Sequence, residues 1–334
     1  FNDKMYLSAL FDKRTKRELC DNGQTLHTFL LAEDVPLAWD NWDIDADIEY
    51  KLRDTATLLE SQVVSCGPIE YRIRNRYQLT ARSSLTQDIV FYADDPMIRF
   101  DTRMDWQDDH RLLKTAFPTS ILSDFARQEI QLGHVKRPTT RNTSIEKAKF
   151  EVCNHRYSAL CDASHGVAVL NDCKYGISMN QNALELTLLR AAAAPEMRAD
   201  NQVHHFTYAF TAWEGDFAGC DVVKQGYELN EKPRLVLGCV PTFSIASVKN
   251  GTVVLDTIKP ALDRSGDLIL RLYESKKAAG KAQILLNVDA KKAWLCDMLE
   301  NKEQEIVIKD GMLELEFGAF QIQTIRLSIE EAMA

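Results

Sequence analysis

The sequence predicts an all-β protein made of two β-sandwiches, a large one over residues 1–245 and a small one over residues 246–334. Short runs in which apolar and polar side chains alternate recur along the chain, as they do in strands with one solvated face. Turn-forming residues separate these runs every ~8–12 residues, a spacing that is typical of sandwiches rather than of a parallel α/β sheet. Long helical patterns are few.

The large sandwich is expected to begin with strands at residues 6–11 and 26–30, on either side of the turn residues Asp21-Asn22-Gly23. Residues 55–64 fit a short helix. Residues 69–79 alternate most regularly of all and predict a strand with one wet face. Further strands are expected at residues 88–92, 97–101, 112–118 and 167–170.

A domain boundary is expected near residues 240–252, where Val240-Pro241-Thr242 and Lys249-Asn250-Gly251 supply turn residues. Beyond it, residues 268–274, 282–286 and 318–327 alternate strongly. Residues 289–300 fit a short helix, but strand, turn and strand around Ala293-Trp294-Leu295 is the better interpretation. A segment of about 85 residues with this pattern matches a small immunoglobulin-like sandwich in size.

Composition and charge exclude few classes of function. The chain has 334 residues, 45% hydrophobic and 27% charged, which is typical of a globular protein with two cores. Its net charge of -9 disfavours nucleic acid and anionic membranes as partners, because both would repel it. No apolar run approaches the ~20 residues that span a bilayer. The eight cysteines form no Cys-x-x-Cys pair, and we expect reduced thiols in a cytoplasm.

Trp39, Asp40, Trp42 and Asp43 form a first candidate site. Indole rings stack on the apolar faces of sugars, and carboxylates accept hydrogen bonds from sugar hydroxyls, so this cluster could be a sugar platform. In the alternative interpretation, both indoles cover the edge of a core and the aspartates cap a turn after Pro36. The sequence leaves both interpretations open.

The second candidate site is the loop Asn171-Asp172-Cys173-Lys174-Tyr175-Gly176, which directly follows the apolar run at residues 167–170. Polar residues at the end of a buried strand lie at the rim of a sheet, where binding groups are often positioned. Asp172 and Lys174 could hydrogen-bond to sugar hydroxyls. The alternative is a turn that is held by its own side-chain hydrogen bonds.

Two further clusters favour structural roles. Arg137, Arg141 and Asn142 surround Pro138, and arginine forks commonly tie loops together by binding carboxylates. Asp200 precedes the pair His204-His205, but adjacent residues of a strand point to opposite faces and cannot easily bind one ion. We therefore expect no metal in this chain.

Three strings of the sequence occur in the order in which a known family carries them. They are Gly133-His134-Val135-Lys136-Arg137-Pro138-Thr139-Thr140-Arg141-Asn142-Thr143-Ser144, Leu170-Asn171-Asp172-Cys173-Lys174-Tyr175-Gly176 and Ala199-Asp200-Asn201-Gln202-Val203-His204-His205-Phe206-Thr207-Tyr208-Ala209. Together they resemble the C-terminal half of the class II α-mannosidases, glycoside hydrolase family 38, most closely the bacterial cytoplasmic type. The family has a Trp-Asp-x-Trp-Asp motif like the one that begins at Trp39, and glycine where Met5 and Gln202 stand here.

The resemblance implies a large sandwich with the mutarotase-like fold, and a chain that is the C-terminal, non-nucleophile part of a retaining exo-α-mannosidase. The family's zinc ligands and nucleophilic aspartate lie in an N-terminal catalytic domain with a His-x-Asp type motif, which this chain lacks. The fragment alone is therefore expected to be inactive. Its implied partners are that catalytic domain in the same polypeptide, α-mannoside glycans and, in a homo-oligomer, a second copy. It would brace the catalytic domain, with Asn171, Asp172, Lys174 and Tyr175 at the rim of the pocket.

Two other classes of function stay open. A stand-alone carbohydrate-binding module would need an exposed aromatic platform, for which Trp39, Trp42 and Trp213 are the candidates. A metal-free sugar epimerase would need a histidine and a glutamate as an acid–base pair in the concave face of the large sandwich.

Overall fold

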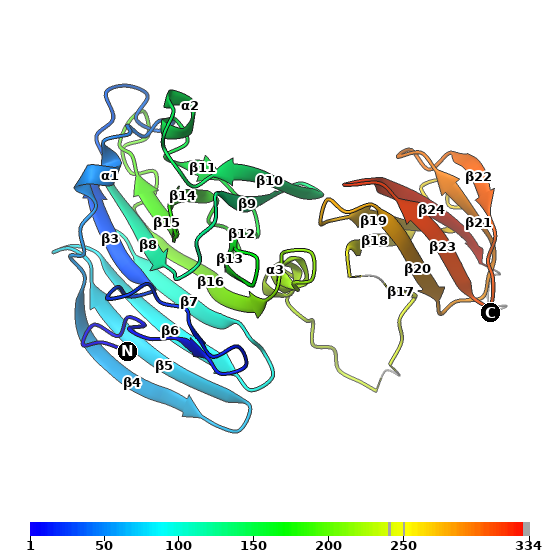
Figure 1. Cartoon of the computed structure of the whole chain (residues 1–334), viewed down its shortest axis with the longest axis horizontal. Helices are drawn as coiled ribbons and strands as arrows, with labels where there is room; N and C mark the ends of the chain where they lie inside the picture. The colour runs from blue at the N-terminus through cyan, green and yellow to red at the C-terminus, as the bar shows by residue number, and fades with distance from the viewer. Residues whose placement is uncertain (240–241, 250, 330–334) are drawn as a thin grey trace. The chain divides into compact units, whose positions relative to one another are not determined.

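The computed structural model describes residues 1–239, 242–249 and 251–329, so Val240, Pro241 and Asn250 of the expected boundary lie outside the described residues. The chain divides into two compact units. The first unit comprises residues 1–129 and 135–232, and the second comprises residues 130–134 and 233–334. Strands are the dominant regular elements of both units and helices are few (Figure 1), which confirms the all-β prediction.

Two antiparallel sheets form most of the first unit. Over the described residues, a nine-stranded sheet has the spatial order β10 (Gly133–Pro138), β9 (Phe125–Ile130), β12 (Tyr157–Cys161), β13 (His165–Asn171), β16 (Val203–Glu214), β7 (Ile98–Asp105), β6 (Ser84–Tyr92), β5 (Glu70–Gln78) and β4 (Thr57–Cys66). A five-stranded sheet in the same described part has the order β11 (Val152–Cys153), β14 (Gly176–Asn180), β15 (Ala183–Ala191), β8 (Arg111–Pro118) and β3 (Thr28–Glu33). A short hairpin of β1 (Phe11–Asp12) and β2 (Arg17–Glu18) lies near the N-terminus.

The apolar core of the first unit lies between these two sheets. Phe100 of β7 contacts Phe117 of β8 with ring centroids 6.0 Å apart and stacks on Tyr208 of β16 at 5.0 Å. Each of these rings is almost completely buried. Burying a large apolar side chain contributes ~1.5–3 kcal/mol, so the facing aromatic residues hold the sheets together. Alternate residues of β7 face this core, and the residues between them face away from it.

Helices are short in the described part of the chain. They are α1 (Ile48–Lys51), α2 (Ser144–Lys147) and α3 (Val222–Asn230). In Figure 1, α3 lies against β12, β13 and β16, and it buries Val222, Val223 and Leu229 there. None of the helices among the described residues has the length and apolar character needed to span a bilayer. The sequence does not predict α3, because nine residues hold little more than two turns of an amphipathic pattern.

The second unit is a smaller two-sheet sandwich. Its described residues form a five-stranded sheet, β18 (Val253–Pro260), β19 (Leu268–Glu274), β24 (Ile322–Ile329), β21 (Ala290–Cys296) and β22 (Lys302–Ile306). They also form a three-stranded sheet, β17 (Ala246–Val248), β20 (Gly280–Leu286) and β23 (Met312–Phe317). Leu270, Ile284 and Leu313 are among the fully buried residues of its core. Residues 289–300 do not form a helix, but the strand–turn–strand interpretation around Ala293-Trp294-Leu295 is right only in part: these three residues lie inside the single strand β21, and the next strand, β22, begins at Lys302.

Two local predictions are wrong. Residues 55–64 do not form a helix but belong to the edge strand β4, most of whose side chains are exposed on both faces. An edge strand without a buried face has no period of two, and so its pattern resembles that of a helix. Residues 6–11 form only an isolated bridge, Leu7 to Leu26, before β1 begins. Met5 has a φ of 59°, a left-handed conformation that glycine adopts more readily.

All eight cysteines fall within the described residues, and none of them forms a disulfide bond.

Gly166 of β13 provides a test of the packing in the first unit. It lies opposite Trp213 of β16, and a Cβ atom added to Gly166 would come 2.0 Å from Cζ2 of that indole. We expect Gly166→Ala to displace the ring and lower the free energy of unfolding by about 1–3 kcal/mol, measured by urea denaturation. Gly280→Ala is the matched control, since nothing lies within 4 Å of the added Cβ in strand β20. Equal denaturation midpoints for the two variants would contradict this packing.

Candidate functional site

One face of the nine-stranded sheet carries a straight row of charged and polar side chains. Arg74 of β5 lies opposite Asp88 of β6, and Asp88 lies opposite Asp101 of β7. Thr207 of β16 lies opposite Asp101, and Asp172 follows β13 on the far side of Thr207. Because side chains alternate along a strand, these residues face away from the aromatic core.

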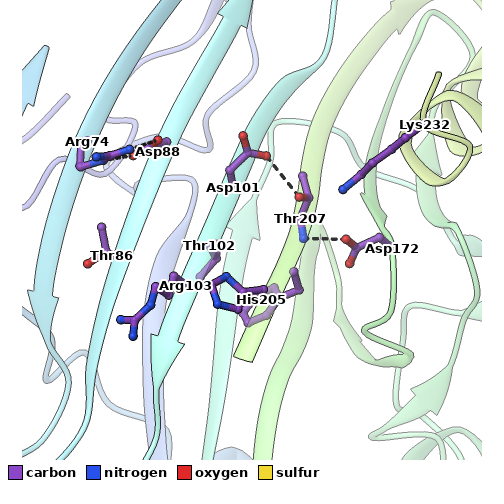
Figure 2. Close-up of a pocket in the computed structure, with 11 residues that line it drawn as sticks. Arg74, Thr86, Asp88, Asp101, Thr102, Arg103, Asp172, His205, Thr207 and Lys232 are labelled. Atoms are coloured by element: carbon purple, nitrogen blue, oxygen red, sulfur yellow. Dashed lines mark hydrogen bonds and ion pairs between the residues drawn. The ribbon is translucent and has the colours of Figure 1, made fainter. Parts of the chain in front are cut away.

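All five residues of this row line a pocket of about 420 Å³ (Figure 2). Arg103 and His205 line one end of it, and Lys232 lines the other. The ammonium group of Lys232 points toward Thr207 and Asp172. Carboxylates, hydroxyls and cationic groups that converge on one cavity suit a polar ligand with many hydroxyls.

The two facing carboxylates of the row are neutralised by arginine. Nη1 of Arg72 donates to Oδ2 of both Asp88 and Asp101 at 3.0 Å, and Arg74 donates to Asp88 through two nitrogens at 2.7 and 2.8 Å. Burial opposes the ionisation of Asp88, but the hydrogen bonds from Arg74 and Arg72 outweigh it and lower the pKa of Asp88 below its ordinary value. This end of the row therefore remains an ionised cluster at neutral pH.

Asp172 is fixed by reciprocal bonds to the neighbouring strand. The N–H of Thr207 donates to Oδ2 of Asp172 at 2.9 Å, and the N–H of Asp172 donates to the carbonyl oxygen of Thr207 at 3.1 Å. Oδ1 of Asp172 is buried and receives no N–H or O–H donor. The thiol of Cys173 hydrogen-bonds to the Asp172 carboxylate, but a thiol is a weak donor, so this carboxylate favours a group that brings a stronger donor to it.

The remaining side chains of the 171–176 loop have separate roles. Asn171 is buried: its Nδ2 donates to Asn154 Oδ1 at 2.9 Å, and its Oδ1 accepts from the N–H of Lys174 at 2.8 Å. It holds the turn in shape and does not reach the surface. Lys174 lies with its Nζ 4.3 Å from the ring centroid of Phe206, and burial lowers the pKa of Lys174. Tyr175 is exposed.

The tryptophan cluster lies in the loop between β3 and β4 and shares no residue with this pocket. Trp39 and Trp42 are 72% and 71% exposed, so they do not cover a core edge within the described chain. Asp40 does not cap a local turn but ties the loop to a distant segment, since its Oδ2 accepts from the N–H of Ala193 at 2.8 Å. Asp43 accepts from the N–H that follows it, at 2.9 Å.

The arginines around Pro138 tie loops together. Arg137 donates to the carbonyl oxygen of Cys153 at 3.2 Å. Arg141 forms an ion pair with Glu49 of α1 and donates to the carbonyl oxygen of Met179 at 3.2 Å. Asn142 donates its backbone N–H to Glu146 at 2.6 Å, at the start of α2.

The two adjacent histidines point to opposite faces of the sheet. Nε2 of His204 is 2.7 Å from the carbonyl oxygen of Asp200, whereas His205 lines the pocket. Among the described residues, no three His, Cys, Asp or Glu side chains are grouped so that they could hold a metal ion. The donors present here do not fit a zinc site.

The sequence alone does not bring Arg74, Asp88, Asp101 and Lys232 together. Their only local signal is the alternation of charged residues along residues 70–76 and 99–103. Which of these charges meet depends on the register between strands, and no pattern within a single strand encodes it.

Two family models match the chain. The model described as the glycosyl hydrolases family 38 C-terminal domain matches residues 1–198. The model described as the glycosyl hydrolases family 38 C-terminal beta sandwich domain matches residues 252–325.

Individual proteins agree with these matches. Alpha-mannosidase 2C1 of Mus musculus is 36% identical over 337 residues, which are 97% of this chain and 32% of that protein. Alpha-mannosidase of Saccharomyces cerevisiae is 31% identical over 303 residues, which are 82% of this chain and 27% of that protein. The chain thus spans about a third of the length of these relatives. A crystal structure of an alpha-mannosidase from Enterococcus faecalis V583 superposes with a TM-score of 0.75 at 14% identity, over 96% of this chain and 40% of that chain, and shows the same fold.

The charged row predicts a pH-dependent stability. Asp88 has a depressed pKa in the folded chain, so its stabilising effect is complete above the unfolded pKa and is lost as the pH falls through the folded pKa. We expect Asp88→Asn to lower the free energy of unfolding by about 1–3 kcal/mol at pH 7, and the difference to shrink below about pH 4. Urea denaturation at both pH values measures it. Asp3→Asn, at an exposed carboxylate, is the control, and a deficit that does not change with pH would refute the mechanism.

Proposed function

The chain belongs to glycosyl hydrolase family 38, and we propose that it is the C-terminal, non-nucleophile part of an α-mannosidase that removes α-linked mannose from glycans. The family matches cover both units, and the similarity to the mouse relative extends over 97% of the chain. Because 32% of that relative is matched, the proposed enzyme contains a large upstream catalytic part in the same polypeptide.

In this proposal, the pocket beside β16 is the part of the chain that approaches the sugar. The observation that supports it is Asp172, which lines the 420 Å³ pocket and has a buried oxygen without an N–H or O–H donor. Lys174 and Tyr175 lie in the same loop, and we assign them to the rim although neither lines the pocket itself. Lys174 contacts Phe206, which does line the pocket, and Asn171 fixes the turn from below the surface. A sugar hydroxyl, or a donor from the catalytic part, would satisfy the Asp172 oxygen.

The charged residues of the row are suited to a structural role rather than to acid or nucleophilic catalysis. A retaining glycosidase needs one carboxylic acid that donates a proton and one carboxylate that attacks the sugar. Asp88 has a lowered pKa and carries no proton to donate at neutral pH. Arg72 and Arg74 occupy both of its oxygens, so it is also a poor nucleophile. We therefore assign the nucleophile and the acid to the upstream part.

We also assign the zinc ion of the proposed enzyme to the upstream part, where it would orient the substrate hydroxyls. The described residues of this chain do not provide a set of ligands for it. Eight free thiols suit a reducing compartment, and we therefore propose that the enzyme is cytoplasmic. We also propose that the enzyme forms a homo-oligomer.

Substitutions in the loop test the rim. In the full-length enzyme, we expect Lys174→Ala and Tyr175→Ala each to reduce kcat/KM for an aryl α-mannoside by about ten-fold, the loss of ~1.4 kcal/mol of transition-state binding. Steady-state kinetics measures this. Lys292→Ala, at an exposed lysine of the second unit, should leave kcat/KM unchanged. The proposed rim is wrong if both loop variants also keep the wild-type kinetics.

Removal of zinc tests whether the metal site lies in the upstream catalytic part and not in this chain. Dialysis against a chelator should abolish the α-mannosidase activity of the full-length enzyme and remove its zinc, measured by atomic absorption. The 334-residue chain expressed alone should contain no stoichiometric zinc, and its thermal unfolding should not respond to the chelator. One tightly bound zinc per isolated chain would contradict the assignment.

A further inference from the structure

One loop of the first unit presents a concentration of large apolar side chains to solvent. Five such side chains occur between residues 35 and 50, in what we call the apolar loop: Val35 is 53% exposed, Leu37 95%, Trp39 72%, Trp42 71% and Tyr50 78%. Single exposed apolar residues are ordinary, but a group of them on one segment marks a surface that is covered by something else. Tryptophan and tyrosine are also the residues that dominate the centres of protein interfaces.

Polar contacts of Asp40 and Asp45 fix the backbone of the apolar loop. Oδ2 of Asp40 accepts from the N–H of Ala193 at 2.8 Å and lies 3.0 Å from Nε2 of His110. Oδ2 of Asp45 accepts from the N–H of Leu37 at 2.8 Å. These hydrogen bonds fix the backbone of the loop, while its five apolar side chains remain exposed to solvent.

The backbone itself favours the exposure of one indole. Trp39 has a φ of 60°, a left-handed conformation that is costly for any residue except glycine. Its carbonyl oxygen accepts from the N–H groups of Trp42 and Asp43 at 2.7 and 2.9 Å, which closes a tight turn around it. The turn keeps both indoles on the outer side of the loop.

The arrangement of the rings fits a protein surface better than a sugar. The indoles of Trp39 and Trp42 meet edge to face, with centroids 6.5 Å apart and planes at 71°. A pyranose stacks on an open, flat aromatic face, and two crossed rings do not extend one flat face. A crossed pair instead forms a knob that fits into a hydrophobic cavity.

Charged groups border the apolar loop, as they border the apolar centre of most interfaces. Lys51 and Asp47 of the adjoining helix form an ion pair with Nζ and Oδ2 2.7 Å apart. The ion pair between Glu49 and Arg141 fastens the same helix to the segment after β10. The surface thus has an apolar centre and a charged margin, and hydrogen bonds and ion pairs hold the backbone beneath it in place.

We propose that the apolar loop is the docking knob that inserts into the upstream catalytic part of the same polypeptide. This inference rests on the proposed function, because the catalytic part is the occupant. The chain matches 32% of the mouse relative, so about two thirds of such a polypeptide lies outside the matched region and needs a surface to pack on. A knob on a braced base would fix the position of the catalytic part relative to the 171–176 loop.

Hydroxyl-radical footprinting of the full-length protein tests this proposal, with oxidation rates read by mass spectrometry. Leu37 is compared with Leu122 and Leu262, which are 73% and 79% exposed in this chain. We expect Leu37 to be oxidised at least about ten-fold more slowly than both references, because the catalytic part covers it. We also expect Trp39 and Trp42 to react no faster than the half-buried Trp213. This protection should not depend on protein concentration or on added mannose.

Three results would overturn the proposal. Leu37 oxidised as fast as Leu122 and Leu262 would show a free surface. Protection that appears only at high protein concentration would show that a second copy is the occupant. Protection that appears only with added mannose would show a sugar platform.

A double variant separates docking from folding. In the full-length protein, Trp39→Ala with Trp42→Ala should raise the oxidation rate of Leu37 to that of Leu262, while the circular dichroism spectrum stays unchanged. Leu262→Ala, an equally exposed site in the second unit, should leave the rate at Leu37 unchanged. If Leu37 stays protected from oxidation in the double variant, the two indoles do not dock the apolar loop and the proposal is wrong. Activity of the unmodified protein on an α-mannoside reports on the proposed function separately, because it does not depend on which surface docks.

Discussion

The two-residue period of the central strands β7 and β16 determines both the core and the pocket of the first unit. Phe100 and Asp101 are neighbours on β7, and one faces the core while the other faces the pocket. Tyr208 and Thr207 have the same relation on β16. A slip of one residue would place the aromatic rings in solvent and the aspartate in the core. The stacking of Phe100 on Tyr208 therefore also fixes Asp101 opposite Thr207.

Asp172 depends on the same register although it lies beyond the end of its strand. Its exchange of hydrogen bonds with Thr207 continues the strand ladder for one more residue, and the buried Asn171 then turns the chain away. The loop thus extends the sheet by one residue, and the hydrogen bonds with Thr207 fix the position of the Asp172 side chain. Such placement suits a group that must meet a ligand or another domain at a fixed position.

The sequence predicts most of the fold because a strand with one solvated face shows a clear alternation of apolar and polar residues. Residues 69–79 and 268–274 alternate, and the structure has β5 and β19 there. The prediction is wrong at residues 55–64 because the edge strand β4 has no buried face, and the alternation is missing. The 171–176 loop can be singled out because it follows an apolar run, but the sequence cannot distinguish the buried Asn171 from Asp172 in the pocket. The meeting of Arg74 with Asp88 arises only from long-range register.

We propose that these residues shape and support a glycosidase whose nucleophile lies elsewhere in the polypeptide. The most direct measurement is the hydrolysis of an aryl α-mannoside by the 334-residue chain and by the full-length protein, at equal concentrations. We expect turnover by the full-length protein and none by the chain alone. Turnover by the chain alone would show that the nucleophile lies among these 334 residues, and the proposed function would be wrong.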